Sequence, residues 1–346
     1  MQCTFPDVQI RLDESNVFEY LRACGALAPG ETATIGPAGD GNINWVRRIR
    51  AGDGSRSFVL KQARPALERF PEYRASTGRL IFEARYYEVS AAWDRERVRP
   101  EVLHFDPEQR VLLLEDLGDV ERLDAALARG APATDALCRV AAFLGSVHAA
   151  TRDPGLAEHF RNEEMQRLHG EHVFALPYRP NDFPMSPALA ECARRVWRDD
   201  ALRERIDAAH GRYLEPRGAL VHADAQAGNI LLAERGAVLL DAEIAHVGDP
   251  AFDVGVLVAH VTILAIARGE RESLGTRLQR LWDAYVGAHG GDELPRYAEV
   301  ARYAGIEMLR RTIGAARVPA VERDEAGLAV AREATRWILG PPSAPR

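Results

Sequence analysis

Apolar residues recur with two different periods along the chain, and the change of period divides it into two parts. Up to residue 117, short apolar runs such as Phe58–Leu60 and Val111–Leu114 are separated by glycine turns, which predicts β-strands joined by hairpins. The segment 77–94 is the exception, since its apolar residues fall at helical spacing. Further along, the helical period dominates, and we expect one helix over 135–151 and another over 187–214.

These patterns predict an α+β protein of two lobes. Residues 1–117 are expected to form an N-lobe, a small antiparallel sheet with one long helix, and residues 118–346 a mainly helical C-lobe. A length of 346 residues agrees with two domains, and a hydrophobic content of 47% is enough for two cores.

Composition and charge exclude several classes of protein. A net charge of −7 argues against binding to nucleic acid. The four cysteines form no C-x-x-C pair, which favours a reducing compartment over a disulfide scaffold or a zinc site. The N-terminus lacks a basic-then-apolar signal pattern, and the apolar stretch Val254–Ala267 is interrupted and too short to cross a bilayer. We therefore expect a cytoplasmic protein that does not bind membranes.

The most informative motif is a His-x-Asp-x4-Asn loop made by His222, Asp224 and Asn229, with Asp241 twelve residues after the asparagine. Phosphoryl transfer requires an in-line nucleophile and neutralisation of phosphate charge. A carboxylate at Asp224 would orient an attacking hydroxyl and accept its proton, as in kinase-fold phosphotransferases. His222 is expected to hydrogen-bond the loop backbone, which is an architectural role.

Three oxygen-bearing side chains near this motif are expected to bind metal. The apolar runs 230–232 and 238–240 flank a glycine turn and predict a hairpin, which would bring Asn229 and Asp241 to the same end. Glu243 adds a second carboxylate two residues later. Because Mg²⁺ prefers hard oxygen ligands, the expected cofactor is Mg²⁺, with ATP as the co-substrate.

The N-lobe contains the features expected of a nucleotide site. A glycine cluster lies between two predicted strands, where backbone amides can approach phosphates closely, and the nucleotide-binding residues expected there are Gly39, Asp40, Gly41, Asn42 and Asn44. Lys61 ends the next strand and is expected to pair with phosphates. Glu83, on the helix 77–94, is the favoured partner of Lys61, and Glu88 is the alternative.

Two further predictions concern the nucleotide base and the support of the catalytic loop. Backbone groups near residues 114–117, including Glu115 and Leu117, are expected to bind the adenine edge at the hinge between the lobes. Asp253, within the segment Gly248–Gly255, is expected to brace the catalytic loop backbone.

The chain resembles the methylthioribose kinases, which act in methionine salvage, within the wider aminoglycoside phosphotransferase and choline kinase group of protein-kinase-like enzymes. Four stretches carry the resemblance: Gly39–Asn44, Val59–Pro65, Leu240–Gly255 and Met308–Val318, the last with its twin arginines. The resemblance implies a bilobal protein-kinase-like fold. It also implies transfer of the ATP γ-phosphate to the 1-hydroxyl of a 5-alkylthio-ribose, Mg²⁺ bound by Asp241 and Glu243, and a homodimer. Arg310 and Arg311 would reach the ribose and stabilise charge on the transferred group.

The catalytic loop departs from this family. Its members usually read His-Gly-Asp-Leu-His-Thr-Gly-Ser, whereas this chain reads His222-Ala-Asp-Ala-Gln-Ala-Gly-Asn229. Ala223, the run Ala225–Ala227 and Asn229 therefore put the acceptor in question, and the asparagine resembles the aminoglycoside and choline kinases. Two other readings stay open. One is an O-phosphotransferase for an antibiotic or an amino alcohol, and the other is an inactive binding protein on a kinase fold.

Overall fold

The computed structural model describes residues 9–38, 44–52, 54–66 and 74–345. The chain forms two compact units. Unit 1 comprises residues 1–89 and 100–119, and unit 2 comprises residues 90–99 and 120–346.

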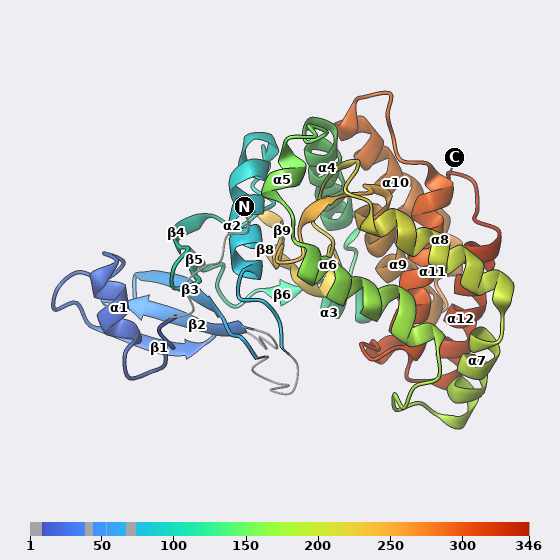
Figure 1. Ribbon diagram of the computed structural model, residues 1–346, viewed down its shortest axis with the longest axis horizontal. Coiled ribbons are helices and arrows are strands. Elements are labelled where there is room, and N and C mark those ends of the chain that lie inside the picture. The colour runs from blue at the N-terminus through green and yellow to red at the C-terminus, as the bar shows by residue number, and fades with distance from the viewer. Residues whose placement is uncertain (1–8, 39–43, 53, 67–73, 346) are drawn as a thin grey trace. The chain divides into compact units, whose positions relative to one another are not determined.

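Unit 1 is a five-stranded antiparallel sheet with helices beside it (Figure 1). The strand order is β1-β2-β3-β5-β4, and every neighbouring pair is antiparallel. Its elements are α1 (Val17–Ala23), β1 (Ala33–Pro37), β2 (Asn44–Ala51), β3 (Arg56–Ala63), α2 (Arg79–Ser90), β4 (Val102–Asp106) and β5 (Val111–Glu115). The helix expected over 77–94 is thus α2, followed by a 3₁₀ turn at Ala91–Trp93.

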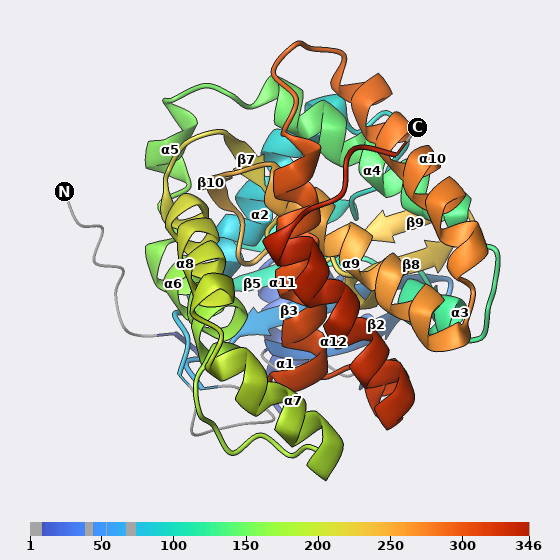
Figure 2. The same ribbon diagram turned by 90° about the vertical axis from the view of Figure 1, so that its right-hand side faces the viewer.

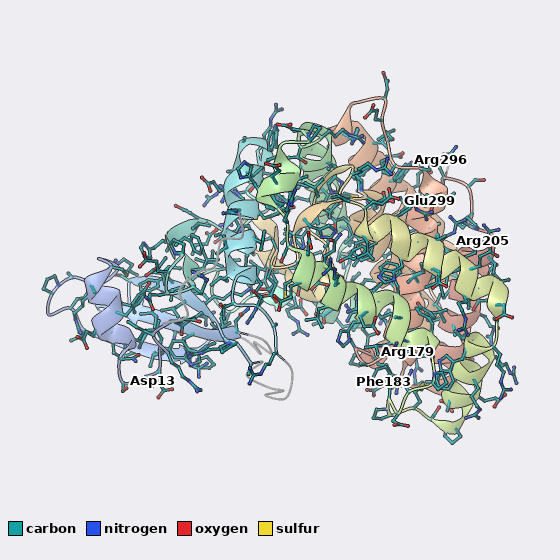
Figure 3. All side chains as sticks on the ribbon, viewed as in Figure 1. Asp13, Arg179, Phe183, Arg205, Arg296 and Glu299 are labelled. Carbon is teal, nitrogen blue, oxygen red and sulfur yellow. The ribbon has the colours of Figure 1, made fainter. Side chains whose placement is uncertain are left out.

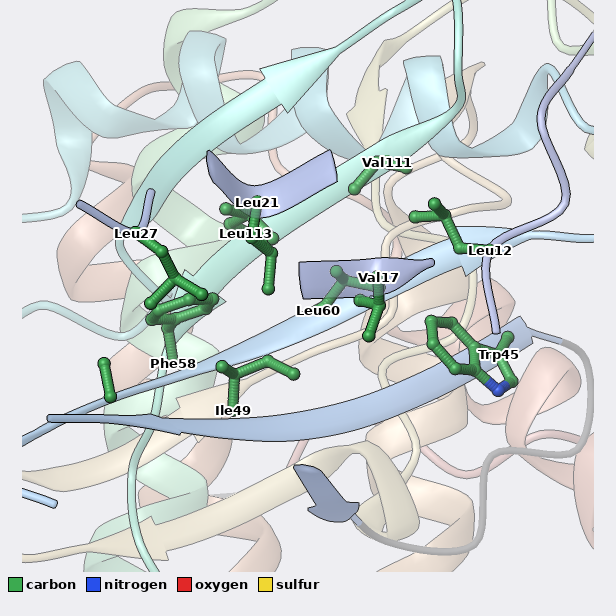
Figure 4. Packing of buried hydrophobic residues seen from close by; sticks show 11 residues of the cluster. Leu12, Val17, Leu21, Leu27, Trp45, Ile49, Phe58, Leu60, Val111 and Leu113 are labelled. Atoms are coloured by element: carbon green, nitrogen blue, oxygen red, sulfur yellow. The ribbon is translucent and has the colours of Figure 1, made fainter. Parts of the chain in front are cut away.

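The core of unit 1 lies between α1 and one face of this sheet, as Figure 4 shows. Because side chains alternate between the faces of a strand, Phe58 and Leu60 of β3 point to the same side, as do Val111 and Leu113 of β5. These residues are almost completely buried with α1 residues such as Leu21. The packing fixes the register of β3, and therefore the position of Lys61 on the opposite face.

Unit 2 is mainly helical, with two small sheets that flank the loop containing Asp224. Its helices are α3 (Leu123–Ala128), α4 (Thr134–Ala150), α5 (Leu156–His159), α6 (Glu163–Gly170), α7 (Pro187–Trp197), α8 (Asp200–Leu214), α9 (Ala251–Arg268), α10 (Arg271–His289), α11 (Tyr297–Ile313) and α12 (Asp324–Leu339). Short π and 3₁₀ turns lie at Glu171–Ala175, Leu176–Tyr178, Ala227–Asn229 and Pro319–Val321. Helix α11 packs between α9 and α12, and α4 packs on α10 (Figure 2).

The small sheets of unit 2 are both antiparallel. β7 (Ala219–Val221) pairs with β10 (His246–Gly248), and β6 (Glu121–Arg122) pairs with the hairpin of β8 (Ile230–Ala233) and β9 (Gly236–Leu239). The predicted hairpin is therefore confirmed, with Glu234 and Arg235 at its turn. The loop that carries Asp224 runs from the end of β7 to the start of β8.

The prediction of a single helix over 187–214 is wrong, because two helices, α7 and α8, occupy this segment. The first ends at Trp197, and the second begins after Asp199, whose side chain accepts a hydrogen bond from the Leu202 N–H at 2.9 Å. An aspartate in this position satisfies a free amide at a helix start and so favours a new helix over continuation of the old one.

Two helices of unit 2 have features that bear on the site. The expectation that the apolar stretch 254–267 is too short to cross a bilayer was wrong, because it lies in α9, which has the length and apolar composition of a membrane span. In the structure, however, 94% of that window is buried inside the protein, as in a core helix. α11 carries Glu299 near its N-terminal end, where Figure 3 labels it. Glu299 lies 2.7 Å from Arg302 Nη1 of the same helix and also pairs with Arg212 of α8. The far end of α11 carries the twin arginines.

Candidate active site

The backbone of the Asp224 loop is held by a buried carboxylate at the start of α9. Asp253 accepts hydrogen bonds from the main-chain N–H groups of His222 and Ala223, both at 2.7 Å. His148 Nε2 lies 3.1 Å from the same carboxylate, and Tyr285 Oη lies 3.1 Å from His148 Nδ1. Burial alone would raise the pKa of Asp253, but His148, His222 and these hydrogen bonds lower it. The Asp253 carboxylate therefore holds the backbone of the Asp224 loop through two main-chain N–H groups, at the place where such a contact was expected.

His222 lies inside this brace. Its Nδ1 accepts a hydrogen bond from the Asp224 N–H at 3.3 Å, and its side chain is fully buried. Burial lowers the pKa of His222, which favours the neutral imidazole that accepts this bond. The arrangement agrees with the architectural role expected of His222.

Two residues next to the site adopt a left-handed backbone that non-glycine residues rarely use. Ala223 has φ of 65° and Asp241 has φ of 66°. Such a conformation costs about 1–3 kcal/mol and persists where the surroundings enforce it, often at functional sites. For Ala223 the enforcing contact is its hydrogen bond to Asp253. A glycine would suit this position before Asp224, because it adopts a positive φ without strain.

The carboxylate of Asp224 is held through one of its two oxygens. Asn229 Nδ2 donates to Asp224 Oδ2 at 2.7 Å and to the Asp224 carbonyl at 2.9 Å. Gln226 Nε2 donates to the same Oδ2 at 3.1 Å. Within the described parts of the chain, Oδ1 receives no such bond, so this oxygen is oriented and available to an incoming hydroxyl.

The residues expected to hold metal gather at one end of the β8–β9 hairpin. Ile230 pairs with Leu239, and the Leu240 N–H donates to the Asn229 carbonyl at 2.8 Å, which places Asn229 and Asp241 at the same end. No cluster of three or more His, Cys, Asp and Glu side chains with metal-site geometry is found among the described residues.

The donor set nevertheless fits a hard divalent cation. Both N–H bonds of the Asn229 amide are directed to Asp224, so the amide oxygen is the atom left for a cation. Two carboxylates follow, Asp241 and the buried Glu243, and the Glu243 carbonyl is fixed by Asn162 Nδ2 at 2.9 Å. One amide oxygen and two carboxylates are the ligand types that Mg²⁺ and Ca²⁺ prefer.

The twin arginines share one buried carboxylate. Glu307 lies one helical turn earlier on α11, with Arg310 Nη1 at 2.9 Å from Oε2 and Arg311 Nε at 2.6 Å from Oε1. Residues three and four positions apart lie on the same face of a helix, so one glutamate can hold two adjacent arginines that would otherwise point about 100° apart. Arg311 Nη2 also donates to Gln226 Oε1 at 2.7 Å. The structure therefore brings Arg311 to the Asp224 loop.

The charged groups of this cluster shift one another's pKa. Burial alone would raise the pKa of Glu307, but Arg310 and Arg311 hold it well below its usual range. Burial lowers the pKa of His172, and Arg310 lowers it further, so this imidazole stays neutral beside the guanidinium. Arg310 interacts with both Glu307 and Asp224, so the two arginines offset the charges of these two carboxylates.

In unit 1, Lys61 and Glu83 form a direct ion pair. Lys61 Nζ lies 2.7 Å from Glu83 Oε2, and the two side chains are 5% and 1% exposed. Tyr87 Oη donates to Glu83 Oε1 at 3.1 Å. The structure thus selects Glu83, and not Glu88, as the partner of Lys61.

The structure describes only some of the other residues predicted to bind the nucleotide. Residues Gly39, Asp40, Gly41 and Asn42 lie outside the described residues. Asn44 begins β2 and accepts a hydrogen bond from Arg79 Nη2 at 2.7 Å. Glu115 ends β5. Its Oε1 accepts a hydrogen bond from the Glu101 N–H at 2.7 Å, so its side chain binds the backbone next to β4. Leu117 follows β5 and is partly exposed.

Two residues of the cluster were missed by sequence reasoning, Glu307 and Gln226. The signal for Glu307 was present as Glu-x-x-Arg-Arg, a carboxylate at both helical contact spacings from the twin arginines. No local signal identifies the contact of Gln226 with Arg311, because the two residues are 85 positions apart.

The sequence is similar to those of known phosphotransferases. Residues 34–300 match the model of the phosphotransferase enzyme family, APH. The methylthioribose kinase of Bacillus velezensis is 27% identical over 350 aligned positions, covering 92% of this chain and 88% of the relative. That of Bacillus cereus is 26% identical, covering 89% and 85%.

Solved structures show the same fold. A choline/ethanolamine kinase family protein from Mesorhizobium loti aligns with a TM-score of 0.53 at 18% identity, covering 94% of this chain and 98% of that one. An amicoumacin kinase in complex with AMP-PNP and Ca²⁺ gives 0.55 at 14% identity, covering 94% and 93%. The predicted α+β, protein-kinase-like fold class is confirmed. The family match extends over most of the chain and the kinase relatives cover nearly all of it, so this chain belongs to the phosphotransferase enzyme family and is a kinase that transfers phosphate to the hydroxyl of a small molecule.

Proposed function

We propose that the protein transfers the γ-phosphate of ATP to the 1-hydroxyl of 5-methylthioribose or a close ribose analogue. The observation that carries this proposal is the pair Arg310 and Arg311, both held by Glu307, with Arg311 linked to Asp224 through Gln226. A guanidinium pair in a desolvated site binds sugar and phosphoryl oxygens and stabilises charge as it develops. The methylthioribose kinases among the relatives support the sugar as acceptor.

Each residue then has a defined task. Asp224 receives the acceptor hydroxyl at Oδ1 and takes its proton as the bond to phosphorus forms. Arg310 and Arg311 hold the sugar and the transferred group. Lys61, kept in place by Glu83, binds the nucleotide phosphates.

Asn229, Asp241 and Glu243 are the residues that would hold Mg²⁺, which when bound neutralises the phosphate charge. The nucleotide is further bound by the glycine segment from Gly39 to Asn44 and, through main-chain groups, by Glu115 and Leu117. The side chain of Glu115 is engaged with Glu101, so its contribution would come from the backbone.

The runner-up is an O-phosphotransferase for an aminoglycoside or an amino alcohol. It is favoured by Asn229 in the catalytic loop and by solved neighbours such as the choline/ethanolamine kinase family protein. The hydrogen-bonding groups of the twin arginines argue against it, because choline and aminoglycosides carry ammonium groups. Arg310 and Arg311 would donate hydrogen bonds to the oxygens of a neutral sugar, whereas an ammonium group offers them no acceptor.

An acceptor panel with Mg-ATP tests the proposal, using methylthioribose, ribose, 5-deoxyribose, choline and several aminoglycosides. We expect saturable turnover of methylthioribose, with kcat/KM higher than for choline or any aminoglycoside by at least about 100-fold, because a site built to hydrogen-bond one substrate discriminates strongly against another. Turnover confined to choline or an aminoglycoside would contradict the proposed acceptor and establish the runner-up.

Helix α11 offers a matched pair of variants for the same assay. Arg310→Met removes a guanidinium three residues after Glu307, and Arg302→Met removes one that is paired in the same way with Glu299. Arg310→Met should lower kcat/KM for the sugar by about 10–1,000-fold, because it removes a charge-assisted contact. Arg302→Met should leave the kinetics near those of the natural protein. Equal losses of kcat/KM in the two variants would show that Arg310 stabilises the helix and does not bind the acceptor.

A further inference from the structure

The amide of Gln226 connects two charged groups from distant parts of unit 2. Its Nε2 donates to Asp224 Oδ2 at 3.1 Å, and its Oε1 accepts from Arg311 Nη2 at 2.7 Å. A flipped amide would place its N–H groups against a guanidinium, which only donates, and its oxygen against a carboxylate, which only accepts. The two partners therefore select one orientation of the glutamine.

The bridge separates Arg311 from Asp224. Arginine and carboxylate groups tend to pair directly through two parallel hydrogen bonds, which would occupy both oxygens of the aspartate. Here the guanidinium is held by Glu307, by the Ala316 carbonyl at 3.3 Å and by Gln226. As far as the described residues show, the side-chain carboxylate of Asp224 is bound only through Oδ2, which accepts from both Gln226 and Asn229.

We propose that Gln226 is a positioning residue for phosphoryl transfer, which couples Arg311 to the loop and directs Asp224 Oδ1 to the acceptor hydroxyl. The proposal rests on the proposed function only in that Asp224 receives the hydroxyl and Arg311 reaches the acceptor site. It does not depend on which acceptor is used. It also gives a role to the glutamine by which this loop departs from the histidine of the methylthioribose kinases.

The first test compares Gln226→Leu with the matched variant Gln279→Leu, which removes another glutamine whose Nε2 donates to a carboxylate, that of Asp283 on the same helix, α10. Gln226→Leu should lower kcat by about 10–100-fold through misplacement of the reacting groups, while KM for Mg-ATP stays within about twofold. Gln279→Leu should change neither. Natural kcat and acceptor KM in Gln226→Leu would overturn the proposal.

Rescue distinguishes positioning from a general loss of structure. Gln226→His should recover most of the activity, because a neutral imidazole can donate from one nitrogen and accept at the other. Gln226→Glu should not, since an ionised carboxylate accepts from Arg311 but has no proton to donate to Asp224. If Gln226→Leu fails to fold, the comparison of Gln226→His with Gln226→Glu tests the proposal in its place. Equal activity of the histidine and glutamate variants contradicts the bridge.

A double-mutant cycle with Arg311→Met completes the experiment. If Gln226 acts through Arg311, the double variant should be impaired about as much as Arg311→Met alone, and fully additive losses would overturn the coupling. The cycle is measured on whichever acceptor of the panel is phosphorylated and on ATP hydrolysis without acceptor. A failure of methylthioribose as acceptor would therefore be distinguishable from a failure of the bridge.

Discussion

The two units treat their key charged side chain in opposite ways. In unit 1, Lys61 is buried in a direct ion pair with Glu83 at 2.7 Å. In unit 2, Asp224 has a cation nearby, yet a neutral amide separates the carboxylate from Arg311. The difference matches the proposed tasks. A lysine that binds phosphates needs a fixed charge and position, whereas a carboxylate that receives a proton needs one oxygen free of strong partners.

The comparison also bears on stability. A buried ion pair is a weak source of net stability, because desolvation offsets the attraction, but removal of one partner leaves an uncompensated charge. Lys61 and Glu83 are in this situation. Asp224 is partly exposed and is held by amides, so its removal should affect the rate much more than the fold.

The largest expected effect is on the rate of the Asp224→Ala variant. Loss of the group that accepts the proton should lower kcat by about 10²–10⁴-fold, the usual contribution of general base catalysis, while Mg-ATP still binds. Calorimetric titration with Mg-ATP measures binding, and Asp241→Ala is the contrasting variant, which should weaken that binding. Normal turnover by Asp224→Ala would show that the core assignment is wrong.

The next effect separates stability from activity in unit 1. Lys61→Met should lower the free energy of unfolding by about 3–5 kcal/mol, because the carboxylate of Glu83 stays buried and loses the ammonium group of Lys61. The double variant Lys61→Met/Glu83→Gln should recover most of this stability and remain inactive. Chemical denaturation measures the stability. If the double variant is as unstable as Lys61→Met, the unpaired charge of Glu83 is not the cause of the lost stability.

Glu307 should make stability depend on pH in the acid range. Its pKa is held well below the usual value by Arg310 and Arg311, although burial acts in the opposite direction. For a depressed carboxylate, the stabilisation is fully present above the unfolded pKa, about 4.3, and is lost as pH falls through the folded pKa.

Glu307→Gln should therefore lower stability by about 3 kcal/mol at neutral pH and by less in acid. Denaturation at several pH values between neutrality and the acid range checks this expectation. Glu299→Gln, at the equivalent spacing from Arg302 but more exposed, is the matched control and should show a smaller effect. A constant difference between natural protein and Glu307→Gln across pH would contradict the assigned charge.

The smallest effect concerns the strained residue before the base. Ala223→Gly relieves a positive φ but loses a buried methyl group and gains freedom in the unfolded chain, so stability should change by less than about 1 kcal/mol. Ala223→Val, with a β-branched side chain at the same φ, should be much less stable. Thermal unfolding of the two variants compares them, and similar melting temperatures would argue against strain at this position.

What the sequence revealed depended on how local each signal was. The spacing of Asn229 and Asp241 around a glycine-turn hairpin predicted their common end, because hairpin geometry is set by neighbouring residues. The break between α7 and α8 was missed, although Asp199 offered a capping signal. The contact of Gln226 with Arg311 depends on how α11 packs against the loop, and no short-range pattern encodes that packing.

The most direct test of the account is phosphorus NMR of the product formed from Mg-ATP and methylthioribose. The account predicts one new phosphomonoester resonance coupled to the proton on C1 of the sugar, formed by the natural protein and absent with Asp224→Ala. Coupling to another sugar proton would contradict the assigned hydroxyl. No new resonance, with phosphorylation of a cationic acceptor in its place, would contradict the proposed acceptor.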